Sequence, residues 1–213
     1  MDVPITHSVG RAGSHMTDEW KFVAIVASTE GVDDLHRVLH PLRTGIAAAI
    51  VVVIKEPVDG PPLTLDQIAR GVSLPTSHAT DGVHVEPGHV FLAPRKQRLT
   101  IDDEGRFRVD RDPATVDTQL ADLLFASAAR VFGARVIGVV MSGRGRDGTA
   151  GLRAIHRVPD ALGIVQSPAD AAVPDMTINA VLGDSPDYLP LVDDMGKLLE
   201  TLIHRPMAPK RST

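Results

Sequence analysis

Two short stretches of the sequence carry side chains that could do chemistry. The first, Ala27-Ser28-Thr29-Glu30-Gly31, follows an apolar run and precedes a helix-forming stretch. A serine hydroxyl at such a junction lies among the free backbone N–H groups of a helix N-terminus, which stabilise a developing oxyanion. Ser28 is therefore a candidate nucleophile. The alternative is that Ser28 or Thr29 caps the helix, as Ser and Thr usually do at that position.

The second stretch, Gly143-Arg144-Gly145-Arg146-Asp147-Gly148, lies between an apolar run and small helix formers. It matches the G-x-G-x-x-G pattern of dinucleotide-binding loops. That function requires a carboxylate at the end of the next strand, about twenty residues on. The next strand-like run instead ends in Gln166 and Ser167. Asp147 would also place a negative charge beside the pyrophosphate, so the pattern disfavours a nucleotide site.

Strand-like apolar runs alternate with helix-like stretches along the chain. This alternation predicts a doubly wound α/β fold, with a mostly parallel sheet, helices on both faces and a small antiparallel flap inserted around 72–110. Expected strands cover 22–27, 47–54, 136–141 and 163–166, and expected helices cover 31–39, 63–71, 117–132, 149–157, 174–182 and 191–203.

The expected strand ends bring the two stretches together. In a doubly wound sheet, ligands bind beyond the carboxyl ends of the strands. Three such ends carry polar residues, at 27–31, at 54–57 and at 141–148. We therefore expect one site built from these three segments.

Composition excludes several classes of function. The net charge of −5 gives no basic face for a nucleic acid. The absence of cysteine excludes disulfides, thiolate nucleophiles and thiolate metal ligands. No apolar run approaches the ~18–20 residues of a membrane span, so we expect a cytoplasmic protein without membrane insertion. Nothing in the sequence predicts a metal or an organic cofactor.

The chain ends are expected to lie outside the fold. Gly13-Ser14-His15-Met16 resembles a cloning remnant, so residues 1–16 are interpreted as an expression-tag leader. The domain is expected over 17–204, and 205–213 as a tail.

Six segments together resemble the catalytic domain of the CheB family, the chemotaxis receptor methylesterases. Two of them are the chemical stretches already described, similar to the family motifs A-S-T-G-G and M-T-G-M-G-x-D-G. The others are similar to its P-G-H-x-Y-x-A-P, D-x-L-F-x-S-x-A, M-P-x-x-A-I and V-x-x-V-L-P-L stretches. The six segments are 23–31, 86–94, 122–129, 141–148, 173–178 and 187–191.

This resemblance implies hydrolysis of γ-glutamyl methyl esters on receptor helices, with related deamidation of glutamine. It implies a serine-hydrolase mechanism in which a serine attacks, a histidine takes its proton and an aspartate orients the histidine. Carried over by motif, the nucleophile is Ser28 and the orienting acid is Asp147. The implied partner is a methylated receptor helix or another protein.

The family's histidine, in a Q-H-M-P motif, is replaced here. Aligned on Pro57, its position holds Lys55. A lysine must be neutral to accept a proton, whereas a nearby carboxylate favours the ammonium form. We therefore expect Lys55 to pair with Asp147 and to be a poor base. For each of the other histidines a structural or surface role is favoured, and His78 is the least improbable substitute.

The site mouth differs as well. Thr29, Glu30, Arg144 and Gly145 are expected to line the oxyanion site. Glu30 replaces a family glycine and adds negative charge there, while Arg144 replaces a methionine. Arg144 and Arg146 are candidates to pair with Glu30 and Asp147. Two functions remain open: an impaired protein-glutamate methylesterase, or a catalytically inactive protein-binding module in chemotaxis-type signalling.

Overall fold

The computed structural model describes residues 20–57, 60, 62–110 and 119–206. The expected leader, 1–16, and most of the expected tail lie outside these residues. Six parallel strands form the main sheet, in the order β3-β4-β2-β1-β7-β8. They are β1 (Lys21–Ser28), β2 (Ala48–Lys55), β3 (Thr76–His78), β4 (His89–Leu92), β7 (Val136–Val140) and β8 (Leu162–Val165).

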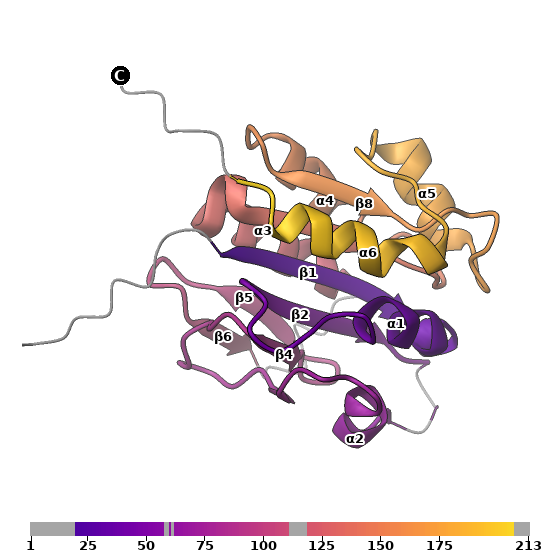
Figure 1. Ribbon diagram of the computed structural model, residues 1–213. Coiled ribbons are helices and arrows are strands. Elements are labelled where there is room, and N and C mark those ends of the chain that lie inside the picture. Colours follow the sequence, from indigo (N-terminus) through magenta and orange to yellow (C-terminus); the bar gives the residue numbers. More distant parts are fainter. Residues whose placement is uncertain (1–19, 58–59, 61, 111–118, 207–213) are drawn as a thin grey trace, which may run out of the picture.

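Helices cover both faces of this sheet (Figure 1). One face carries α3 (Leu120–Phe132), α4 (Thr149–His156) and α5 (Asp175–Gly183). The other carries α1 (Val32–Leu39), α2 (Leu65–Ala69) and α6 (Val192–Ile203). The predicted doubly wound α/β class is therefore confirmed.

The alternation of side chains along each central strand feeds two separate cores. In β1, Phe22, Ala24 and Val26 belong to the core under α3 and α4. Val23, Ile25 and Ala27 belong to the core under α1 and α6. All six are fully buried, as expected of a central parallel strand covered on both sides.

The inserted segment 72–110 divides between two sheets. Its antiparallel part is the hairpin of β5 (Arg98–Ile101) and β6 (Phe107–Asp110), which packs on α3. Its earlier strands, β3 and β4, instead join the parallel sheet, because the apolar side chains of β4 pair with β2 and are buried.

The direction of the crossovers changes between β1 and β7. The chain leaves β1 through the 3-10 turn η1 (Thr29–Gly31) into α1 on one face, and leaves β7 into α4 on the other. Adjacent loops that diverge in this way open a crevice at the carboxyl ends of the strands. The stretches around Ser28 and Asp147 both lie at this point.

No helix in the described ranges combines the length and apolar character needed to cross a bilayer.

Candidate active site

Ser28 and Lys55 face each other at the carboxyl ends of two neighbouring strands. They are register partners of β1 and β2, the last pair of that ladder. Because side chains alternate along a strand, both lie on the α3–α4 face, opposite to Ala27 and Ile54. The register therefore places a hydroxyl beside an ammonium group.

The Ser28 side chain is buried and does not cap a helix. Its residue is 2% exposed, and its hydroxyl has no hydrogen-bond partner of good geometry within the described part of the chain. Ser28 occupies the N-cap position of η1 with extended backbone, yet its side chain accepts no capping bond. The capping interpretation of Ser28 is thus wrong, and a buried hydroxyl without a partner suits a reactive role better.

Lys55 and Asp147 form the predicted ion pair. The Lys55 Nζ lies 3.6 Å from Asp147 Oδ2, and the Asp147 side chain is 1% exposed. Burial raises the pKa of Asp147, and the Lys55 ammonium opposes that rise. The Asp147 carboxylate thus has a cation beside it where the family places a histidine.

Asp147 and Asp122 tie the two helices beside the site to each other. The Asp147 carboxylate accepts from the N–H groups of Ala121 (3.1 Å) and Asp122 (3.1 Å), in the first turn of α3. The Asp122 carboxylate in turn accepts from the N–H of Gly151 (2.6 Å), in the first turn of α4. Each helix N-terminus is therefore capped by a carboxylate from the other segment.

Asp122 is a second partly buried carboxylate of the same cluster. Burial raises its pKa, while the first-turn N–H groups of α4 and the Lys55 charge oppose the rise. Sequence reasoning missed this role. The available signal was an acidic residue in the first turn of an expected helix, where carboxylates are favoured.

The glycines of the 143–148 loop allow close backbone approach. A Cβ at Gly143 would lie 2.7 Å from Met176 Sδ and 3.1 Å from Ser28 Cβ. Gly148 has φ +93°, and a Cβ there would lie 2.8 Å from a Val140 methyl. The loop therefore needs glycine for turning and packing beside Ser28, which explains the pattern without a nucleotide.

Arg144 and Gly145 lie in the exposed part of this loop and carry backbone N–H groups. Neither N–H donates a hydrogen bond among the described residues, whereas the Gly143 N–H donates to Val173 O. Free N–H groups near a nucleophile are the donors from which an oxyanion site is built.

Glu30 and Arg144 form an ion pair between the two loops that follow β1 and β7. Arg144 Nε lies 3.4 Å from Glu30 Oε1, so this predicted pair is confirmed. Thr29 Oγ1 donates to the other Glu30 oxygen at 3.1 Å. The Glu30 backbone N–H, with the nearby Ser28 hydroxyl, holds the pKa of Glu30 below its ordinary value. Glu30 is thus an ionised carboxylate beside the candidate nucleophile.

His78 lies on the wrong face of the sheet to act on Ser28. It is level with Leu92 and Val52, whose side chains belong to the α1–α6 core. Three strand spacings, about 14 Å, also separate β3 from β1. His78 therefore does not take the place of the family histidine. His156 is likewise engaged elsewhere, between Asp184 and Asp187.

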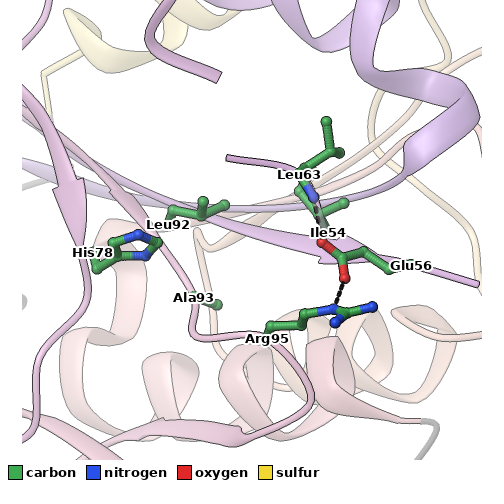
Figure 2. Close-up of a pocket in the computed structure, with 7 residues that line it drawn as sticks. All are labelled: Ile54, Glu56, Leu63, His78, Leu92, Ala93 and Arg95. Atoms are coloured by element: carbon green, nitrogen blue, oxygen red, sulfur yellow. Dashed lines mark hydrogen bonds and ion pairs between the residues drawn. The ribbon is translucent and has the colours of Figure 1, made fainter. Parts of the chain in front are cut away.

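A small pocket lies beside His78, away from Ser28. Figure 2 shows Glu56 among its lining residues, accepting from the Leu63 N–H and paired with Arg95. Its apolar walls Ile54, Leu63 and Leu92 pack with the α1–α6 core. This pocket is therefore separate from the Ser28 site. The described residues also contain no cluster of three metal-binding side chains.

Gln166 is a second residue that sequence reasoning missed. It is fully buried at the end of β8, where its Oε1 accepts from the Ser142 N–H and its Nε2 donates to Asp34. It thereby holds the start of the 142–148 loop in place. A polar residue directly after an apolar strand was the available signal.

Comparison with known proteins gives concordant matches. The family model of CheB methylesterase matches residues 23–199. A protein-glutamate methylesterase/protein-glutamine glutaminase of Myxococcus xanthus is 32% identical over 187 residues, 86% of this chain and 54% of that protein. One from Bordetella parapertussis is 31% identical over 198 residues, 90% of this chain and 56% of that protein. The chain thus spans just over half the length of these relatives.

A solved structure has the same architecture. The crystal structure of the Thermotoga maritima CheB methylesterase catalytic domain superposes with a TM-score of 0.78 at 25% identity. The match covers 86% of this chain and 99% of that one.

Proposed function

Because the chain belongs to the CheB methylesterase family, we propose that it hydrolyses γ-glutamyl methyl esters on a protein partner, slowly, with Ser28 as nucleophile. The observation that carries this proposal is the Ser28 hydroxyl, which is buried and without a partner of good geometry in the described residues. Ser28 abuts Gly143, which precedes the two N–H groups without acceptors in the described residues, and its register partner Lys55 pairs with Asp147.

The proposed reaction passes through an acyl-enzyme. Ser28 Oγ adds to the ester carbonyl carbon, and the N–H groups of Arg144 and Gly145 stabilise the negative oxygen that forms. Collapse expels methoxide, which leaves as methanol with the proton lost by Ser28. Water then attacks the acyl carbon; one of its protons restores the Ser28 hydroxyl, and the new carboxylic acid loses the other to solvent and leaves as a glutamate carboxylate. Deamidation of a glutamine follows the same steps with ammonia as the leaving group.

Low turnover is expected because of Lys55. Its Nζ lies 3.6 Å from Asp147 Oδ2, so Lys55 is the cationic member of an ion pair. An ammonium has no lone pair to accept the Ser28 proton. General-base assistance contributes about 10²–10⁴-fold in enzymes that have it, so we expect a rate that is lower by a factor of this order.

Methanol release from a peptide containing γ-methyl glutamate tests the proposal. The chain and its Ser28→Ala variant are compared at equal concentration. Slow release that disappears in Ser28→Ala is the expected result. Release that persists in Ser28→Ala would assign the activity to another group and overturn the role of Ser28.

The second candidate is a protein-binding module without hydrolysis. The Lys55–Asp147 ion pair favours it, because it occupies the base position with a cation. Binding of the ester peptide without any methanol release, unchanged in Ser28→Ala, would select this alternative.

A further inference from the structure

Helix α5 carries an exposed apolar strip. Ile178 is 42% exposed and Leu182 is 82% exposed, the highest value among the large apolar residues described. Their spacing of four residues places them one above the other on the same side of the helix. The opposite side of α5 is buried through Met176 and Ala180. The strip is therefore an outward-facing surface on a well-anchored helix.

Helix α5 is hydrogen-bonded directly to the 143–148 loop, which adjoins the nucleophile. The Met176 N–H donates to Gly143 O at 2.8 Å, and Asn179 Nδ2 donates to Gly145 O at 3.0 Å. Gly143 itself abuts Ser28. In Figure 1, α5 lies beyond the arrowhead of β8, at the end of the sheet where the site is built. A chain segment bound at Ser28 therefore has the strip within reach.

Two exposed arginines flank this surface. Arg146 lies on the site loop and makes no ion pair among the described residues. Arg153 Nε donates to Gly183 O at 2.6 Å, directly after Leu182. Helix α5 itself has one carboxylate, Asp175, at its N-terminal end, and Asp184, which follows Gly183, is engaged with His156 Nδ1 at 2.7 Å. The surface thus combines apolar contact near Leu182 with positive charge on both sides, which complements an acidic amphipathic segment.

We propose that the α5 strip docks an amphipathic helix of the substrate protein, one that carries free and methyl-esterified glutamates together with apolar residues. This inference rests on the proposed function for its choice of partner. Six residues of helix, about 9 Å, separate Met176 beside the site loop from Leu182. The partner therefore places an apolar residue about two turns from the ester, over Leu182, with its free glutamates near Arg146 and Arg153.

Peptide binding tests this proposal without requiring turnover. The probe is a fluorescent synthetic helix that carries two γ-methyl glutamates among free glutamates, with leucines two turns away. Leu182→Glu is expected to weaken its binding at least about ten-fold, since a charge opposes both the apolar contact and the acidic helix. Val83→Glu is the matched control, because Val83 is an exposed apolar residue (46%) outside α5. It should bind the probe as the original chain does.

A second probe separates apolar docking from charge. Replacing the peptide leucines by serine should weaken binding to the original chain and make it insensitive to Leu182→Glu. Equal binding by Leu182→Glu and the original chain, or no binding by either, would overturn the proposal. So would a dimer that Leu182→Glu dissociates in sedimentation, because a second copy would then cover the strip.

The binding test and the methanol-release test can fail separately. Binding that depends on Leu182 without methanol release leaves the docking surface standing and removes the esterase. Methanol release together with binding that is unchanged in Leu182→Glu would keep the esterase and remove the docking surface. Thermal unfolding of Leu182→Glu checks that the fold is unchanged, as expected for a side chain so exposed.

Discussion

Lys55 is the register partner of Ser28, one strand away and on the same face of the sheet. This relationship gives Lys55 the position from which a base would serve the nucleophile. Its ion pair with Asp147 gives it the wrong charge for that task. On the proposed function, low turnover would therefore have a chemical cause, since the strands that carry Ser28 and Lys55 pair in register up to these two residues.

Lys55→His is expected to raise methanol release by about 100-fold, at the lower end of general-base contributions. A neutral imidazole can accept the Ser28 proton, and Asp147 then stabilises the imidazolium that forms. Methanol release from the ester peptide measures the gain. Adding Ser28→Ala to Lys55→His should abolish it, and an unchanged rate in Lys55→His would mean that the site mouth, too, blocks turnover.

Lys55→Met is expected to lower the free energy of unfolding at neutral pH by about 1–3 kcal/mol, less than for a fully buried pair because Lys55 is partly exposed. The raised pKa of Asp147 means that its ionised form already costs stability, and this cost is absent at pH values below its unfolded pKa. The loss caused by Lys55→Met should therefore shrink as the pH falls and Asp147 becomes protonated.

Urea unfolding at several pH values measures this difference. Lys197→Met, at an exposed position of α6, is the control and should have little effect at any pH. A loss for Lys55→Met that stays constant down to about pH 4 would contradict coupling to Asp147.

Glu30→Gln is expected to raise kcat of the Lys55→His variant by about ten-fold. The change removes a negative charge near the oxygen that becomes negative in the transition state. Because the pKa of Glu30 is held low, the carboxylate is charged throughout the neutral range. The gain should accordingly be equal at about pH 6 and about pH 8. A gain confined to one end of that range would point to a different titrating group.

Gly148→Ala is expected to lower the free energy of unfolding by about 3 kcal/mol, through a left-handed backbone and contact with buried valines. Gly145→Ala is the matched comparison, because Gly145 has φ +89° but open space around its Cβ position. Its cost should be only about 1 kcal/mol. Thermal or urea unfolding distinguishes the two, and equal costs would contradict the packing role of Gly148.

The sequence was sufficient for the fold class and for the meeting of three strand ends. Long apolar runs such as 47–54 and their alternation with helices determine a parallel sheet, and parallel strands bring their carboxyl ends together. The pairing of Lys55 with Asp147 could be anticipated because the motifs aligned both residues to one family site.

Other features depend on register and packing, which local patterns do not specify. The short strands β3 and β4 resembled the following hairpin in sequence, and only the pairing of β4 with β2 and of β3 with β4 separates them from it. The sequence favoured a structural or surface role for His78, but only its strand position shows which face of the sheet it occupies. The Asp122 contact spans 29 residues to Gly151, beyond any local motif.

The exchange of capping bonds between Asp122 and Asp147 gives Asp147 a second task that needs no substrate. A version of this domain that had lost hydrolysis entirely would still require a carboxylate at 147 to hold the start of α3 beside α4. The presence of this aspartate in a relative is accordingly poor evidence that the relative is an active enzyme. The more informative position is 28, where no hydrogen bond of good geometry within the described residues depends on the side chain.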